Sequence, residues 1–156
     1  MAKQTTSEDK YLFTKFERLQ SYKQEKRAIE LFKEYFDHDF TFRSVIVGNF
    51  LKDLEWLVPE GAPKFEAARS ESTEPTSIHR VFRQGFIAAL VKPRGQKFNI
   101  NNQVKAEKKF IGVLEGLHQK DADILVAMKD KKLTELYPII TRSFAMKAVG
   151  KKLDEV

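Results

Sequence analysis

The stretch from Phe42 to Leu57 reads FRSVIVGNFLKDLEWL, and it decides the fold class. Apolar residues recur in it three and four positions apart, which is the spacing of one face of an α-helix. The apolar face is so wide that much of this helix must be buried. The apolar positions are Val45, Ile46, Val47, Phe50, Leu51, Leu54 and Leu57.

The segments on both sides of this stretch have the same helical period. Only 7 glycines and 5 prolines occur, which disfavours a turn-rich all-β architecture. The sequence therefore predicts an all-α fold, a single compact bundle of six or seven short helices formed by residues 1–156. Helices are expected over residues 7–20, 24–36, 42–57, 77–91, 103–118, 121–131 and 138–150.

Capping residues indicate where several of these helices begin. Ser7 and Asp121 are suited to cap the first and sixth helices, and Pro138 suits the first turn of the last one. Asp37 or Asp39 is expected to cap the helix that follows His38.

One long loop, residues 58–76, interrupts the helical pattern with Pro59, Gly61, Pro63 and Pro75. Loops of this length are uncommon inside compact domains and often have a function or move. Two interpretations stay open: a surface connection that wraps the body, and a binding loop.

The chain lacks the residue patterns of the common enzyme classes. It has no cysteine, no glycine-rich phosphate loop and no His-Glu-x-x-His motif. The three histidines, His38, His79 and His118, have no partner at metal-ligand spacing. We therefore predict no catalytic residues, no metal and no cofactor, and we rank an enzyme below a binding protein.

Hydrophobic runs are short throughout the chain. None approaches the roughly 18 residues that a membrane span needs, and residues 1–10 contain no apolar signal-peptide core. We expect a cytoplasmic protein that does not bind membranes.

The net charge of +6 is concentrated in one part of the chain. Residues 1–58 are balanced, whereas residues 77–120 hold nine basic and two acidic side chains. If the two helices of this helix–connection–helix segment pack antiparallel, their basic groups form one surface that binds nucleic-acid phosphates. The alternative is an ordinary solvated face. The candidate residues are Arg80, Arg83, Lys92, Arg94, Lys97, Lys105, Lys108 and Lys109.

The C-terminal half contains a distinctive string, LEGLHQKDADIL at residues 114–125, followed by MKDKKL at 128–133 and by Tyr137-Pro138 and Thr141. Together with Val58-Pro59-Glu60-Gly61-x-Pro63, it resembles an uncharacterised family of small proteins from large contractile-tailed phages. The resemblance implies a phage protein in the host cytoplasm and carries over no catalytic or binding residues.

Two functional hypotheses follow. The first is a small non-enzymatic phage accessory protein that binds DNA or RNA, or a nucleoprotein machine, through the basic segment. The second is a protein-interaction module that contacts a host or phage protein, or a minor virion component. Its candidate contacts are the 58–76 loop, Trp56, Lys131 and Lys132.

Overall fold

The computed structural model describes residues 11–51, 54–61, 63, 77–91 and 100–154, and within them the fold is all-α, as predicted. No β-strand occurs among these residues, and an isolated antiparallel bridge joins Trp56 and Val91. Ser7, predicted to cap the first helix, lies outside the described residues. The elements are α2 (Phe13–Ser21), α3 (Glu25–His38), α4 (Phe40–Phe50), α5 (Ile78–Arg83), α6 (Phe86–Leu90), α7 (Ile100–Gly116), α8 (Gln119–Lys129), α9 (Leu133–Leu136), α10 (Arg142–Val149) and the 3-10 helix η1 (Gly150–Asp154).

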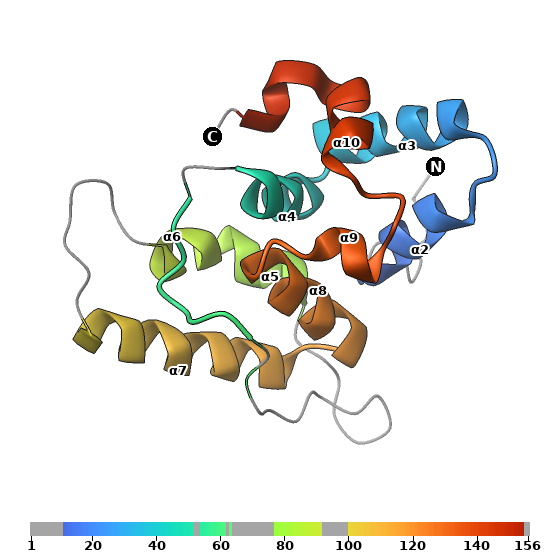
Figure 1. Ribbon diagram of the computed structural model, residues 1–156. Coiled ribbons are helices and arrows are strands. Elements are labelled where there is room, and N and C mark those ends of the chain that lie inside the picture. The colour runs from blue at the N-terminus through green and yellow to red at the C-terminus, as the bar shows by residue number, and fades with distance from the viewer. Residues whose placement is uncertain (1–10, 52–53, 62, 64–76, 92–99, 155–156) are drawn as a thin grey trace.

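Helix α4 lies at the centre of the bundle (Figure 1). It contacts α3, α5, α8 and η1, and its residues Phe42, Val45 and Ile46 are completely buried. A helix surrounded in this way needs apolar residues in almost every direction, which is what the Phe42–Phe50 sequence provides. The prediction of a largely buried helix is confirmed.

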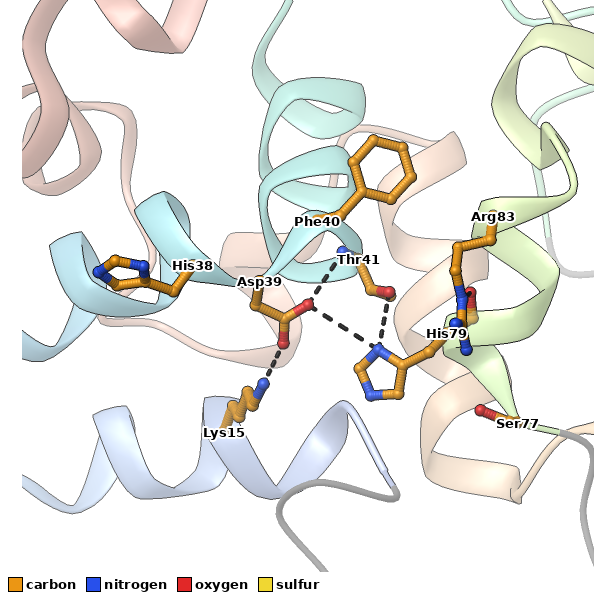
Figure 2. A pocket seen from close by; sticks show the side chains of 8 residues that line it. All are labelled: Lys15, His38, Asp39, Phe40, Thr41, Ser77, His79 and Arg83. Atoms are coloured by element: carbon orange, nitrogen blue, oxygen red, sulfur yellow. Dashed lines mark hydrogen bonds and ion pairs between the residues drawn. The ribbon is translucent and has the colours of Figure 1, made fainter. Parts of the chain in front are cut away.

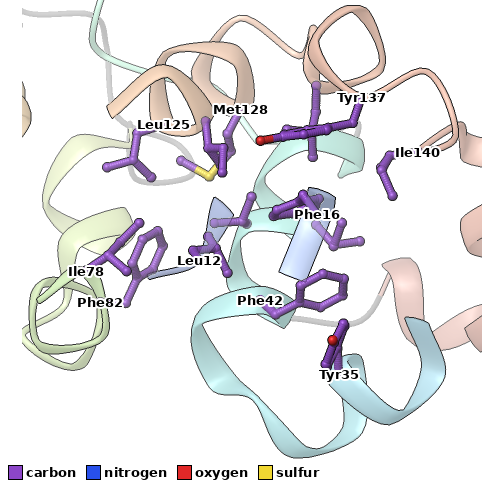
Figure 3. Close-up of a cluster of buried hydrophobic side chains, with 14 of the residues drawn as sticks. Leu12, Phe16, Tyr35, Phe42, Ile78, Phe82, Leu125, Met128, Tyr137 and Ile140 are labelled. Atoms are coloured by element: carbon purple, nitrogen blue, oxygen red, sulfur yellow. The ribbon is translucent and has the colours of Figure 1, made fainter. Parts of the chain in front are cut away.

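Aromatic rings from several helices meet around Phe42 (Figure 3). The centroid of its ring lies 5.1 Å from that of Phe16, 5.2 Å from Phe32 and 5.4 Å from Tyr35. Phe16 in turn stacks on Tyr137 at 5.2 Å. These stacked and edge-on contacts join α2, α3, α4 and the segment before α10 into one core.

The predicted helix over 42–57 is too long, because α4 ends at Phe50. Two distant cations bond the last carbonyls of the helix: Arg142 donates to the Phe50 oxygen at 2.8 Å and Lys131 to the Leu51 oxygen at 2.9 Å. Beyond Leu51 the chain turns toward α6, where the Leu57 N–H donates to the Leu90 oxygen at 2.8 Å. Periodicity alone does not reveal such long-range caps.

The predicted helix over 77–91 is broken into α5 and α6 at Gly85, which has a φ of 83°. This left-handed conformation favours glycine. The break directs the two halves to different neighbours, since α5 packs on α4 while α6 packs on α7. Phe86 illustrates this, because its ring stacks on Phe110 of α7 at 6.2 Å.

Two predicted helix starts are also corrected. The last helix begins at Arg142 rather than Pro138, because the Thr141 hydroxyl accepts from the Phe144 N–H at 3.1 Å and caps it. Helix α8 is capped by His118, whose Nδ1 accepts from the Lys120 N–H at 3.1 Å. Burial, aided by the Lys120 charge, lowers the pKa of His118 and favours the neutral ring that can accept this bond.

Asp121, predicted to cap α8, instead caps a different helix. Its side chain is buried and accepts hydrogen bonds from the backbone N–H groups of Phe13 at 2.8 Å and Leu12 at 3.4 Å. These groups open α2, whose first N–H donors have no partner within the helix. One carboxyl group thus joins the first turn of α8 to the start of α2.

Burial raises the pKa of Asp121 to about 6, although both backbone hydrogen bonds oppose the shift. The folded protein therefore binds this proton more tightly than the unfolded chain, whose carboxyl titrates near 4. Stability from this group is fully present below pH 4 and is lost as the pH rises to about 6, a change of about 3 kcal/mol at most.

The test compares wild type with Asp121→Asn, which keeps an oxygen acceptor and has no charge. Urea unfolding from pH 4 to pH 7 should show the wild type losing stability relative to the variant. A constant difference between the two proteins across this range would contradict the assignment.

Candidate nucleic-acid interface

Helix α7 presents a basic face to solvent. Its inner side is formed by the buried residues Ala106, Phe110 and Leu114, and Phe110 anchors it against α6. The helical period places Lys105, Lys108 and Lys109 on the other side, where all three are exposed. We call Lys105, Lys108 and Lys109 the lysine face.

The lysine face lacks local charge compensation. No acidic residue occurs three or four positions before or after any of its lysines, whereas Lys26, Arg27 and Lys33 of α3 all have Glu30 at such a position. The ion pairs between described residues involve other lysines, such as Lys120 with Glu17 at 2.7 Å and Lys147 with Glu25 at 3.0 Å.

Lys105 also lies three and four residues from the two other lysines, so the face repels itself. Such like-charge neighbours destabilise a helix by a few tenths of a kcal/mol per pair. A bound anion would remove this repulsion.

Gly112 lies on the same face, three residues after Lys109 and four after Lys108. A Cβ at this position would meet no atom within 4 Å, so packing inside the chain does not require glycine here. Glycine in a helix interior costs up to about 1 kcal/mol relative to alanine. The absence of a side chain leaves the backbone open to close approach from outside.

The structure divides the predicted basic residues into two groups. Arg80 and Arg83 are exposed on α5, which packs on α4, and the lysine face is on α7. In Figure 1, α5 and α6 run in the opposite direction to α7, and α6 contacts α7. The three predicted residues of the connection, Lys92, Arg94 and Lys97, lie outside the described residues.

Arg83 lines a pocket of about 490 Å³ between α2, α4 and α5, which we call the polar pocket (Figure 2). Arg83 Nε donates a hydrogen bond to the backbone oxygen of His79 at 3.3 Å, which holds the Arg83 side chain along α5. The lining residues are Lys15, His38, Asp39, Phe40, Thr41, Ser77, His79 and Arg83.

Asp39 organises the polar pocket. As predicted, it caps a helix: its carboxylate accepts from the backbone N–H groups of Thr41 at 2.9 Å and Phe42 at 3.2 Å. It also forms an ion pair with Lys15 and lies 3.8 Å from Nδ1 of His79. The carboxylate charge is thereby balanced inside the protein.

A second pocket, of about 420 Å³, lies between α4 and α5–α6, and we call it the apolar pocket. Phe40 lines both pockets, and 52% of this side chain is exposed. Neither Phe40 nor Lys15 was predicted from the sequence as a site residue. The residues of the apolar pocket are Phe40, Arg43, Ser44, Val47, Gly48, Leu51, Leu54, Phe82, Gly85, Ile87 and Val91.

The residues predicted to contact a protein partner have contacts inside the molecule. Trp56 is half-buried and packs against the core beside Gly48. Lys131 donates to the Leu51 oxygen at 2.9 Å, and Lys132 pairs with Glu60 at 3.2 Å. Their role in binding a partner stays a prediction.

The sequence did not predict that Lys129 is buried. Its ammonium group is buried, pairs with Asp130 and donates to the carbonyl oxygens of Pro59 at 2.7 Å and Gly61 at 3.1 Å. Asp130 accepts from the Gly61 N–H at 3.2 Å. We call Lys129 and Asp130 the clamp, because they hold the start of the predicted long loop on α8.

Comparison with known proteins gives one match. Residues 16–135 match a family described as "Family of unknown function (DUF6433)", which is more than half of the chain. The chain belongs to DUF6433. No curated protein and no solved structure matches this chain.

The part of the chain that matches DUF6433 contains the elements described above. Phe40, Arg43, Arg83 and the lysine face all lie within it, and Lys15 lies one residue before it. Membership of DUF6433 assigns no activity, so a function has to be argued from these surfaces.

Two features are absent from the described part of this DUF6433 protein. No group of three His, Asp or Glu residues gathers there in a way that could hold a metal ion. No described helix is long and apolar enough to cross a membrane.

Proposed function

We propose that this protein is a small non-enzymatic protein that binds nucleic acid through the lysine face, with Arg80 and Arg83 as further phosphate contacts. The observation that carries the proposal is that no acidic residue stands three or four positions from any lysine of the lysine face. Phosphates at this face would relieve the repulsion between the lysines and release counterions from the nucleic acid.

The shape of α7 supports the same proposal. Gly112 lies one turn beyond Lys108 and Lys109 on the same face, so a sugar–phosphate backbone can approach the helix there without meeting a side chain at this position. The sequence also resembles proteins of contractile-tailed phages. We therefore propose that it is a phage accessory protein that acts on DNA or RNA in the cytoplasm of an infected cell.

Replacing Lys105, Lys108 and Lys109 together with glutamine should weaken binding to a labelled oligonucleotide by about a hundredfold at low salt. The slope of log affinity against log salt should become shallower by about 2 to 3, because three phosphate contacts are lost. Thermal stability should not fall, because the substitution removes repulsion. Fluorescence anisotropy between about 50 mM and about 200 mM salt measures the binding.

The matched control replaces Lys26, Arg27 and Lys33 of α3 with glutamine. It removes the same charge from a face that contains Glu30. Its affinity should stay close to that of wild type. If both variants lose the same affinity, the effect depends on net charge alone and the lysine face is not the binding site. If the α7 variant binds as tightly as wild type, the proposal is overturned.

A further inference from the structure

Phe40 is a large aromatic side chain that the fold leaves exposed. It is the first residue of α4, directly after the capping Asp39, and 52% of it is open to solvent. The Phe40 ring points away from Asp39 and Lys15 (Figure 2). It forms the ridge between the polar pocket and the apolar pocket.

One arginine lines each of the two pockets that Phe40 shares. Arg43 follows Phe40 by three residues on α4, so the two share a helix face, and Arg43 lines the apolar pocket. Arg83 lines the polar pocket from α5. Both arginines are exposed. Phe40 therefore lies where two pockets meet, each with an exposed arginine among its lining residues.

This combination matches the chemistry of a nucleotide within a strand, which has a flat base between two phosphates. Aromatic rings in single-strand-binding proteins stack on bases of any sequence, and basic groups beside them hold the backbone. In a duplex the faces of the bases are already stacked on one another, so Phe40 could not reach them. The ligand has to be an unpaired nucleotide.

We propose that Phe40 stacks on an unpaired base of a single strand, while Arg43 and Arg83 bind the phosphates on either side. This inference rests on the proposed nucleic-acid function and extends it by naming the strand type. The charge in the polar pocket agrees with this inference, because Asp39, the only carboxylate among its described lining residues, is paired with Lys15.

The experiment measures the affinity of the full chain for oligo(dT) and for a duplex of the same length. Phe40→Ala should lower the oligo(dT) affinity by about tenfold, which is within the range for loss of one base–aromatic stack. Duplex affinity should be unchanged. Phe40→Trp should retain oligo(dT) binding, and its added fluorescence should be quenched by oligo(dT) and not by the duplex.

Each other outcome has a defined meaning. Unchanged oligo(dT) affinity in Phe40→Ala overturns the inference, and so does equal quenching by the duplex. If dTMP alone quenches Phe40→Trp with the affinity of oligo(dT), the site takes free mononucleotides and the strand assignment is wrong. In a competition experiment, an acidic amphipathic peptide can be compared with unlabelled oligo(dT). If the peptide displaces labelled oligo(dT) at a lower concentration, the site is a protein-docking surface and the inference is wrong.

Failure of this inference can be separated from failure of the proposed function. The glutamine variant of the lysine face tests the function through all nucleic acids, duplex included. Phe40→Ala tests only the single-strand contact. A protein that loses binding in the first variant and keeps it in the second binds nucleic acid without using Phe40.

Discussion

Phe42→Ala should lower the free energy of unfolding by about 3–5 kcal/mol, the usual range for removing a fully buried phenylalanine. The Phe42 side chain is completely buried, and its ring touches Phe16, Phe32 and Tyr35. Removing it leaves a cavity at the junction of α2, α3 and α4, where helices held by several contacts cannot collapse into the space. Urea unfolding followed by circular dichroism measures the change.

Phe40 provides a matched control two positions earlier on the same helix. Phe40→Ala removes the same atoms from a side chain that is 52% exposed, and it should cost less than about 1 kcal/mol. A similar loss in both variants would show that α4 is not the buried centre of the bundle. The small cost also makes Phe40→Ala a folded protein for the binding test.

Lys129→Met should destabilise the protein by about 3–5 kcal/mol, because breaking a buried ion pair leaves its partner without a counter-charge. The side chains of Lys129 and Asp130 are only 1% and 7% exposed. Without the ammonium group, the carbonyl oxygens of Pro59 and Gly61 lose this donor, and the Gly61 N–H is the donor that Asp130 keeps among the described residues. Thermal unfolding in the presence and absence of urea measures the loss.

Two further variants test the origin of this effect. Lys132→Met breaks the exposed pair with Glu60, whose side chains are 49% and 71% exposed, and should cost less than about 1 kcal/mol. Lys129→Met combined with Asp130→Asn should recover part of the stability, because no unpaired charge remains. A double variant as unstable as Lys129→Met alone would mean that the charge of Asp130 is not the cause.

The fold class followed from local patterns, and the helix ends did not. The period of Val45, Ile46 and Phe50 was sufficient to predict a buried helix at the centre. The end of α4 depends on Arg142 and Lys131, which are some 80 to 90 residues away in the sequence. The break at Gly85 depends on which neighbour each half contacts. Such features arise from packing and leave no periodic signal.

The candidate site shows the same division. Counting charges located the lysines of α7, and the helical period placed them on one face. Phe40 carries no signal of its own, because a phenylalanine among thirteen is expected to be buried. Only the positions of α4 and α5 show that it is exposed where the pockets lined by Arg43 and Arg83 meet.

The bonds from Asp121 to the start of α2 have a consequence for folding during synthesis. Helix α2 leaves the ribosome early, but the carboxyl group that caps it is made more than a hundred residues later. Contacts this distant in sequence form slowly, because a long loop must close first. The N-terminal helix should therefore dock only after α8 has emerged, and nascent chains that stop before Asp121 should leave α2 open to proteases.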